Sequence, residues 1–142
     1  GGTKNGALFG EAVCIQDPAI AEDFRYIIKQ RGGMLAKGWL LGIQFEQLMR
    51  DGLYEELAAH ANALALRLRD GIAALGYGFA FDSPSNQQFP ILPDRVLKKL
   101  REEFHWEEMG KPDTEHTTIR LVTSWATRPE AVDAFLTALA RA

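Results

Sequence analysis

The spacing of apolar residues changes abruptly at Gly76, and this change limits the folds open to the chain. Before it, apolar side chains recur in steps of three and four, as on one face of a long helix: Leu53, Leu57, Ala61, Leu64, Leu68, Ile72 and Leu75. After it, Tyr77, Phe79 and Phe81 alternate with small residues, which is typical of a strand. The second half of the chain therefore combines a long helix with a sheet.

The residues after Gly76 predict an antiparallel sheet that is covered on one face by helices. The turn Ser83–Asn86 separates two alternating segments and indicates a hairpin, and Pro90 in the second segment indicates an edge strand. Further patterns follow in order: a helix after Pro93, a strand within His105–Met109, a strand over Thr117–Thr123, and a last helix with the capping-box spacing of Thr127 and Glu130. This order is that of an α+β domain.

The first half of the chain predicts one strand followed by helices. Glu11–Ile15 has the pattern of a short buried strand, so Cys14 within it is expected to be a buried and inert thiol. Asp17 and Pro18 predict a helix start, because aspartate caps helices and proline is tolerated at the first helical position.

The helix expected from about Leu35 to Arg50 is apolar on nearly every side. Such a helix is buried inside a large protein or at an interface, and a chain of 142 residues supplies too few partners to cover it. We therefore expect some of its apolar side chains to be exposed in the isolated chain, or covered by a neighbouring chain: Trp39, Leu40, Ile43 or Phe45.

Charge and cysteine content argue against several classes of function. The net charge of −3 shows no basic excess, so we expect no nucleic-acid partner. No apolar run approaches the length that spans a bilayer, so we expect no membrane partner, and no spacing of cysteine and histidine predicts a zinc site. The single cysteine cannot form an intramolecular disulfide. These observations suit a cytoplasmic protein.

The lysine among the first seven residues, Gly1–Ala7, has an unusual setting. Lys4 is flanked by glycines and has no charged residue within six positions, whereas surface lysines usually have charged neighbours. Glycines allow sharp turns and the close approach of another group, so a lysine placed there suits imine formation with a carbonyl. The alternative is a flexible, glycine-rich tail.

Two separated motifs resemble those of one enzyme family. Thr3–Gly6 and the following Gly10–Val13 resemble the cofactor-lysine segment of L-threonine aldolases and related β-eliminating lyases, which are fold type I pyridoxal-phosphate enzymes. Ile119–Thr127 resembles the C-terminal strand of that family, which carries a carboxylate-binding arginine. Between them, Lys29, Gln30 and Lys37 fit one branch of the family.

The resemblance implies a role for each basic residue of these motifs. Lys4 would be the catalytic lysine that binds pyridoxal 5'-phosphate as a Schiff base, and Arg120 would hold the carboxylate of an amino-acid substrate by two hydrogen bonds. The cofactor phosphate would be bound by the remaining residues: Thr3, Lys29, Arg31 and Lys37. By pattern alone, a paired structural role is favoured for Arg120, and a solvated helix end is favoured for the basic cluster.

The family's ring-stacking group, pyridinium partner and phosphate cradle are not found in the chain, so we expect it to be the C-terminal part of a longer enzyme that is inactive by itself. Residues 1–50 would end the cofactor-binding large domain of an α/β to α+β enzyme, with a linking helix. Residues 51–142 would form the small domain. A homo-oligomer, dimer or tetramer, is expected, with active sites near subunit contacts.

The implied reaction is retro-aldol cleavage of a β-hydroxy-α-amino acid to glycine and an aldehyde. Two alternatives remain open at this point. A β-eliminating lyase or aminotransferase of the same fold would use the same lysine and arginine. A helical interaction module without catalysis would use the apolar helix of Leu35–Met49 as its binding face.

Overall fold

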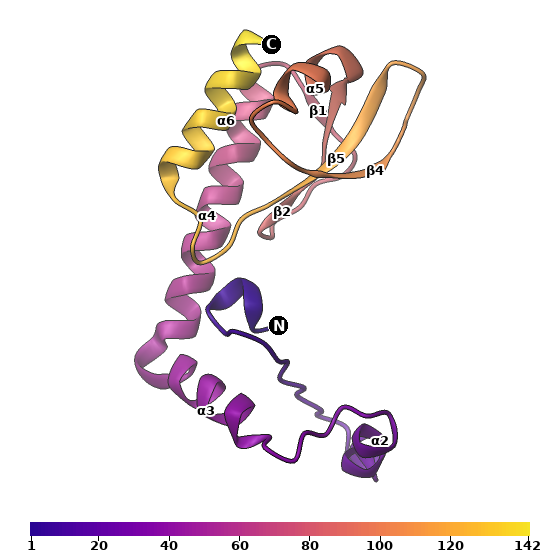
Figure 1. The fold of residues 1–142 in the computed structure, drawn as a ribbon, viewed down its shortest axis with the longest axis vertical. Coiled ribbons are helices and arrows are strands. Elements are labelled where there is room, and N and C mark those ends of the chain that lie inside the picture. Colours follow the sequence, from indigo (N-terminus) through magenta and orange to yellow (C-terminus); the bar gives the residue numbers. More distant parts are fainter. The chain divides into compact units, whose positions relative to one another are not determined.

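The computed structural model describes residues 1–142, which form two compact units, Gly1–Glu55 and Glu56–Ala142 (Figure 1). The boundary between them falls in the first turn of the long helix α4 (Leu53–Ala74). All strands of the chain lie in the second unit.

Short helical segments make up the first unit: η1 (Thr3–Asn5), α1 (Pro18–Ala21), α2 (Phe24–Gln30), α3 (Trp39–Leu48) and η2 (Arg50–Gly52). The helix start predicted at Asp17 and Pro18 is confirmed, because the Asp17 carboxylate accepts a hydrogen bond from the backbone N–H of Ala19 at 2.9 Å. At Asp23 the backbone adopts a left-handed φ of 53°, which separates α1 from α2.

The strand predicted at Glu11–Ile15 is not formed. Residues 10–17 contain neither helix nor strand, and Val13 is 65% exposed. Cys14 is exposed too, so the prediction of a buried thiol is wrong. A strand exists only where a neighbour takes up its backbone hydrogen bonds, and no strand of this chain pairs with these residues.

The prediction for the apolar helix is confirmed by α3, although the helix begins later than expected, at Trp39. Trp39 is 65% exposed, Leu40 40% and Ile43 56%, and Leu48 is the one buried residue of the helix. The first unit therefore presents apolar side chains that it does not cover by itself.

A five-stranded antiparallel sheet organises the second unit: β1 (Gly78–Phe79), β2 (Gln87–Gln88), β3 (Pro90–Pro93), β4 (Glu107–Gly110) and β5 (His116–Val122). β2 and β3 follow one continuous register along one edge of β5, and β1 pairs with β3. β4 pairs with the other edge of β5, from Thr118 to Arg120. Beyond Arg120 that edge has no partner strand.

Three helices share a core with this sheet: α4, α5 (Asp94–Leu100) and α6 (Pro129–Arg141) (Figure 1). Its buried members include Ile72 of α4, Leu92 of β3 and Ile119 of β5, each fully buried. α6 approaches α4 closely at Gly71, where an added Cβ would lie only 2.5 Å from a methyl group of Leu136. The predicted α+β arrangement is therefore confirmed.

Two local predictions for the second unit are wrong. Pro90 does not lie in an edge strand, because β3 pairs with both β1 and β5. Pro90 is the first residue of the strand, where its missing N–H is tolerated. The capping box is not formed either: α6 begins with Pro129 at its N-terminus, and the Thr127 hydroxyl instead accepts a hydrogen bond from the backbone N–H of Ser124 at 2.9 Å.

Candidate active site

Lys4 lies on η1, a tight turn whose backbone is well anchored. The carbonyl of Gly2 accepts hydrogen bonds from the backbone N–H groups of Asn5 and Ala7, both at 3.0 Å. Gly6 ends the turn with a left-handed φ of 103°, a conformation that glycine adopts without strain. The glycines around Lys4 thus build a defined turn and not a flexible tail.

Two buried residues fix this turn against the rest of the first unit. The Asn5 side chain is 6% exposed, and its Nδ2 donates a hydrogen bond to the carbonyl of Tyr54 at 2.8 Å. Gly2 is buried where a Cβ would lie 2.8 Å from the Cβ of Ala7 and 3.1 Å from the ring of Phe45. Lys4 itself is exposed and forms no ion pair. The amine of Lys4 on this turn is therefore exposed and not paired with a carboxylate.

The other predicted cofactor-binding residues are all exposed. Thr3 precedes Lys4 on η1. Lys29 lies in the last turn of α2 and Arg31 directly follows that helix, while Lys37 lies in the segment before α3. None of the three cations forms a side-chain hydrogen bond or an ion pair. Although these three cations are close in sequence, they do not form an anion-binding site within the first unit.

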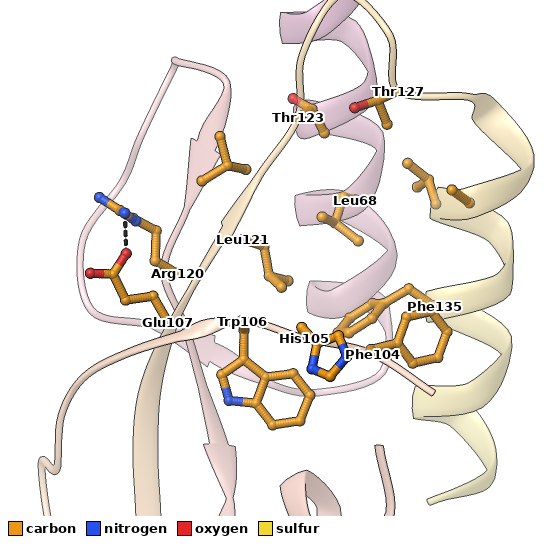
Figure 2. A pocket seen from close by; sticks show the side chains of 13 residues that line it. Leu68, Phe104, His105, Trp106, Glu107, Arg120, Leu121, Thr123, Thr127 and Phe135 are labelled. Carbon is orange, nitrogen blue, oxygen red and sulfur yellow. Dashed lines mark hydrogen bonds and ion pairs between the residues drawn. The ribbon is translucent and has the colours of Figure 1, made fainter. Parts of the chain in front are cut away.

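Arg120 lines a pocket of about 350 Å³ in the second unit (Figure 2). The pocket lies at the edge of β5 that β4 leaves unpaired, and α4 and α6 contribute to its wall through Leu68 and Phe135. The segment leading into β4 supplies aromatic side chains, Phe104 and Trp106. The pocket therefore has a mainly apolar lining, with the charged side chain of Arg120 at its rim.

The Arg120 side chain is 35% exposed and is held from the neighbouring strand. Glu107 is its direct partner across β4 and β5, and the Glu107 carboxylate accepts a hydrogen bond from Arg120 Nη2. The Nε of the same guanidinium is buried and has no hydrogen-bond partner. Buried polar groups are normally paired, so this donor fits a ligand group with acceptor oxygens.

The wall of the pocket is rigidly packed. The rings of Phe104 and Phe135 meet edge to face at a centroid distance of 5.2 Å. The Thr123 hydroxyl is buried and donates to the carbonyl of Ala61 in α4 at 2.7 Å, which ties the end of β5 to that helix. The guanidinium of Arg101 lies 5.4 Å from the centre of the Trp106 ring.

Two carboxyl groups with shifted pKa values lie outside this pocket. The hydrogen bond from Lys111 lowers the pKa of Asp94, and that from Thr117 Oγ1, at 2.6 Å, lowers it further. The backbone N–H of Glu115 lowers the pKa of Asp113, with a second contribution from the His116 side chain. Both groups are ionised carboxylates in local hydrogen-bond networks, so neither has the raised pKa of a general acid.

Residues that position the predicted groups were not identified from the sequence. Asn5 anchors the lysine turn through its hydrogen bond to the carbonyl of Tyr54, and Glu107 contacts the guanidinium of Arg120. The Asn-Gly pair signals a turn but not the contact with Tyr54. No sequence pattern gives Glu107 a partner, and only the pairing of β4 with β5 shows that Glu107 faces Arg120.

The structure describes the two predicted centres separately, because Lys4 belongs to the first unit and Arg120 to the second. Chemically, the first offers an amine for a carbonyl compound and the second offers a planar donor for a carboxylate. No cluster of three side chains suited to hold a metal ion occurs in the chain. No helix combines the length and apolarity needed to cross a membrane.

The chain is similar in sequence to L-threonine aldolases. It is 36% identical over 102 residues to a low specificity L-threonine aldolase of Pseudomonas sp. strain NCIMB 10558, and 33% identical over 102 residues to that of Pseudomonas aeruginosa. Each match covers 71% of this chain but 30% of the relative. No family model matches the chain. The resemblance expected from the two motifs is therefore confirmed over a part of these relatives.

Solved structures agree with this similarity. A threonine aldolase of Leishmania major matches 89% of this chain with a TM-score of 0.83 and 42% identity, over 37% of its own length. An 8-amino-7-oxononanoate synthase of Francisella tularensis matches 88% with a TM-score of 0.61 and 17% identity, over 39% of its length, and shows a shared fold alone. The expected fold class, part of a fold type I pyridoxal-phosphate enzyme, is confirmed.

Proposed function

We propose that this chain is part of a pyridoxal-phosphate-dependent lyase that resembles L-threonine aldolase. The proposed reaction cleaves a β-hydroxy-α-amino acid, threonine or allo-threonine, to glycine and an aldehyde. The observation that carries the proposal is the match to the Leishmania major threonine aldolase, which extends over 89% of this chain at a TM-score of 0.83. A free-standing interaction module has no comparable support.

Lys4 is the residue proposed to bind the cofactor. Its support is the anchored turn, in which Gly2 and Asn5 are buried while the Lys4 amine is exposed and free of carboxylate partners. Such an amine is placed to react with the aldehyde of the cofactor. When bound, pyridoxal phosphate supplies an electron sink at the substrate Cα, so that a bond to this atom can break.

Arg120 is the residue proposed to bind the substrate carboxylate. Its guanidinium lies at the rim of the pocket and keeps a buried Nε without a partner. A planar fork that holds a carboxylate fixes the orientation of the amino acid, and orientation decides which bond to Cα breaks. A lysine at this position would supply the charge but not the fork.

The cofactor phosphate is proposed to contact the exposed cations Lys29, Arg31 and Lys37, with the Thr3 hydroxyl as a further donor. Because these cations have no ion-pair partner in the first unit, we propose that a neighbouring subunit completes the site in a homo-oligomer, a dimer or a tetramer. The exposed apolar side chains of α3 supply a surface for such an assembly.

The domain assignment also remains a proposal: residues 1–50 would end the cofactor-binding domain and residues 51–142 would form the small domain. The division of the chain into compact units between Glu55 and Glu56 supports it. The domain assignment is also supported by the position of the strands, because no strand precedes β1. The residues that form the hydrophobic core of the sheet and its helices all belong to the second unit.

The proposal is tested with the full-length enzyme that contains this chain. We expect the purified protein to show the visible absorbance of bound pyridoxal phosphate and to release an aldehyde and glycine from threonine or allo-threonine. Release of a keto acid without glycine would instead indicate elimination or transamination. A protein without cofactor absorbance would contradict the proposal altogether.

A further inference from the structure

We infer that Glu107 positions Arg120 for the substrate carboxylate, an inference that rests on the function proposed above. The two residues are direct partners in the β4–β5 register, so their side chains project from the same face of the sheet. Glu107 Oε2 accepts a hydrogen bond from Arg120 Nη2, as Figure 2 shows. Glu107 is thus a positioning residue, which acts on the substrate through Arg120.

The contact with Glu107 holds the guanidinium without using all of its donors. A guanidinium carries five N–H donors in one plane, and a carboxylate binds to two of them along one edge. Glu107 engages only Nη2, whereas Nε is buried and unpaired. The Nε is enclosed by protein atoms, so the donors open to an incoming carboxylate are those of Nη1, which has no hydrogen-bond partner. Glu107 therefore fixes the plane of the fork and leaves donors for a second carboxylate.

The adjacent residue of β4 shows that this pairing is specific. Glu108 lies opposite Ile119, one position along β5, and therefore projects from the other face of the sheet. It forms an ion pair with Arg101, which does not line the pocket. Two neighbouring glutamates thus hold two different arginines, and Glu108 provides a matched control for Glu107.

The pair contributes to binding more than to folding. The Glu107 side chain is 59% exposed, and ion pairs at such exposure add little to stability. Removing Glu107 is therefore expected to leave the sheet folded. Arg120, without its acceptor, would sample several orientations, and the substrate carboxylate would have to select the productive one.

The test compares three variants of the full-length, cofactor-loaded enzyme with the wild type. The dissociation constant of glycine is measured by the change in cofactor absorbance, and KM and kcat are measured with threonine. For Glu107→Ala we expect both the glycine dissociation constant and KM to rise about tenfold, as for one weakened charge-assisted hydrogen bond, with kcat changed by less than about threefold. Glu107→Gln keeps an acceptor oxygen and should stay within about threefold of the wild type in all three.

The third variant, Glu108→Ala, should bind glycine within about twofold of the wild type, because its partner Arg101 lies over the Trp106 ring and does not itself line the pocket. Equal glycine binding by Glu107→Ala and the wild type would overturn the inference. So would a Glu108→Ala variant as weak as Glu107→Ala, or a Glu107→Gln variant that is not rescued. A wild-type enzyme that neither binds glycine nor releases aldehyde would overturn the proposed function, and this inference with it.

Discussion

The two units of the chain differ in how far they bury their own apolar residues. In Glu56–Ala142, side chains from three helices and two strands form one core, in which Ile72, Leu92 and Ile119 are fully buried. In Gly1–Glu55, Ala7 and Leu48 are the only buried apolar residues, while Leu8, Val13 and Trp39 are more than half exposed. The second unit is held by its own core, and the first is held mainly by local turns and helices.

Because of this difference, the positions of the two proposed functional residues are fixed in different ways. Arg120 lies on the central strand of a packed sheet, so its position follows from the core beneath it. Lys4 depends on a short turn that is fixed by Gly2, Asn5 and one hydrogen bond to Tyr54. We therefore expect substitutions to reveal independent stability in the second unit and dependence on neighbouring polypeptide in the first.

The largest effect is expected for Lys4→Ala in the full-length enzyme. Loss of the amine should remove the covalent bond to the cofactor and lower kcat by about a thousandfold or more. The fold should not change, because Lys4 is exposed and unpaired. Activity assays and circular dichroism together check this expectation, and a variant that keeps more than a tenth of wild-type activity would contradict it.

The comparison of the two units is tested by truncating one isoleucine in each. Ile72→Ala should destabilise the chain by about 2–5 kcal/mol, because it leaves a cavity in a filled core. Ile43→Ala, at a side chain that is 56% exposed, should change the stability of the isolated chain by no more than about 0.5 kcal/mol. Urea unfolding measures both.

The effect of Ile43→Ala should differ between the isolated chain and the full-length protein. There, Ile43→Ala should cost more than about 1 kcal/mol, because α3 is proposed to be covered by other polypeptide. Equal, small effects of Ile43→Ala in both settings would contradict the proposed covering of α3.

Arg120→Lys should retain the cofactor but lower kcat/KM by about ten- to a hundredfold, since a charge-assisted, two-point contact with the substrate is lost. Absorbance of the cofactor and steady-state kinetics measure the two properties separately. If the variant loses its fold and its cofactor together, Arg120 is a structural partner of Glu107 and not a substrate ligand.

The smallest expected effect is the dependence of the stability of the second unit on pH. The folded-state pKa of Asp94 is lowered from the ordinary value of 3.8, mainly by Lys111, so the ionised carboxylate stabilises the second unit above that pH. This stabilisation is lost as the pH falls through the lowered pKa. The difference in urea midpoint between wild type and Asp94→Asn should therefore shrink as the solution is acidified. A difference independent of pH would contradict this.

Sequence patterns predicted the elements of the second unit well because that unit supplies its own partners. The stripe from Leu53 to Leu75 needs a sheet to cover it, and the alternating residues after Gly76 form that sheet. The Pro90 prediction was wrong because an edge strand and the first residue of an inner strand tolerate proline equally. Glu107 could not be assigned because its partner depends on strand register, which local patterns do not specify.

In the first unit the same reasoning was less successful. Glu11–Ile15 has a strand pattern, but the chain contains no strand that pairs with it, so its apolar residues and Cys14 are exposed. Local signals, such as the Asp17 cap, were confirmed because they need only neighbouring residues. The roles of Lys4, Arg120 and the basic cluster of Lys29, Arg31 and Lys37 remain predictions, since they concern groups that the chain does not contain.

Borohydride reduction of the full-length enzyme, followed by peptide mapping, shows directly whether Lys4 binds the cofactor. Reduction makes the bond between a lysine amine and the cofactor aldehyde permanent, so the modified lysine can be identified by mass. We predict a single pyridoxyl-phosphate label, on Lys4, which lies on the anchored turn η1. A label on Lys29 or Lys37, or the absence of any label, would contradict this prediction.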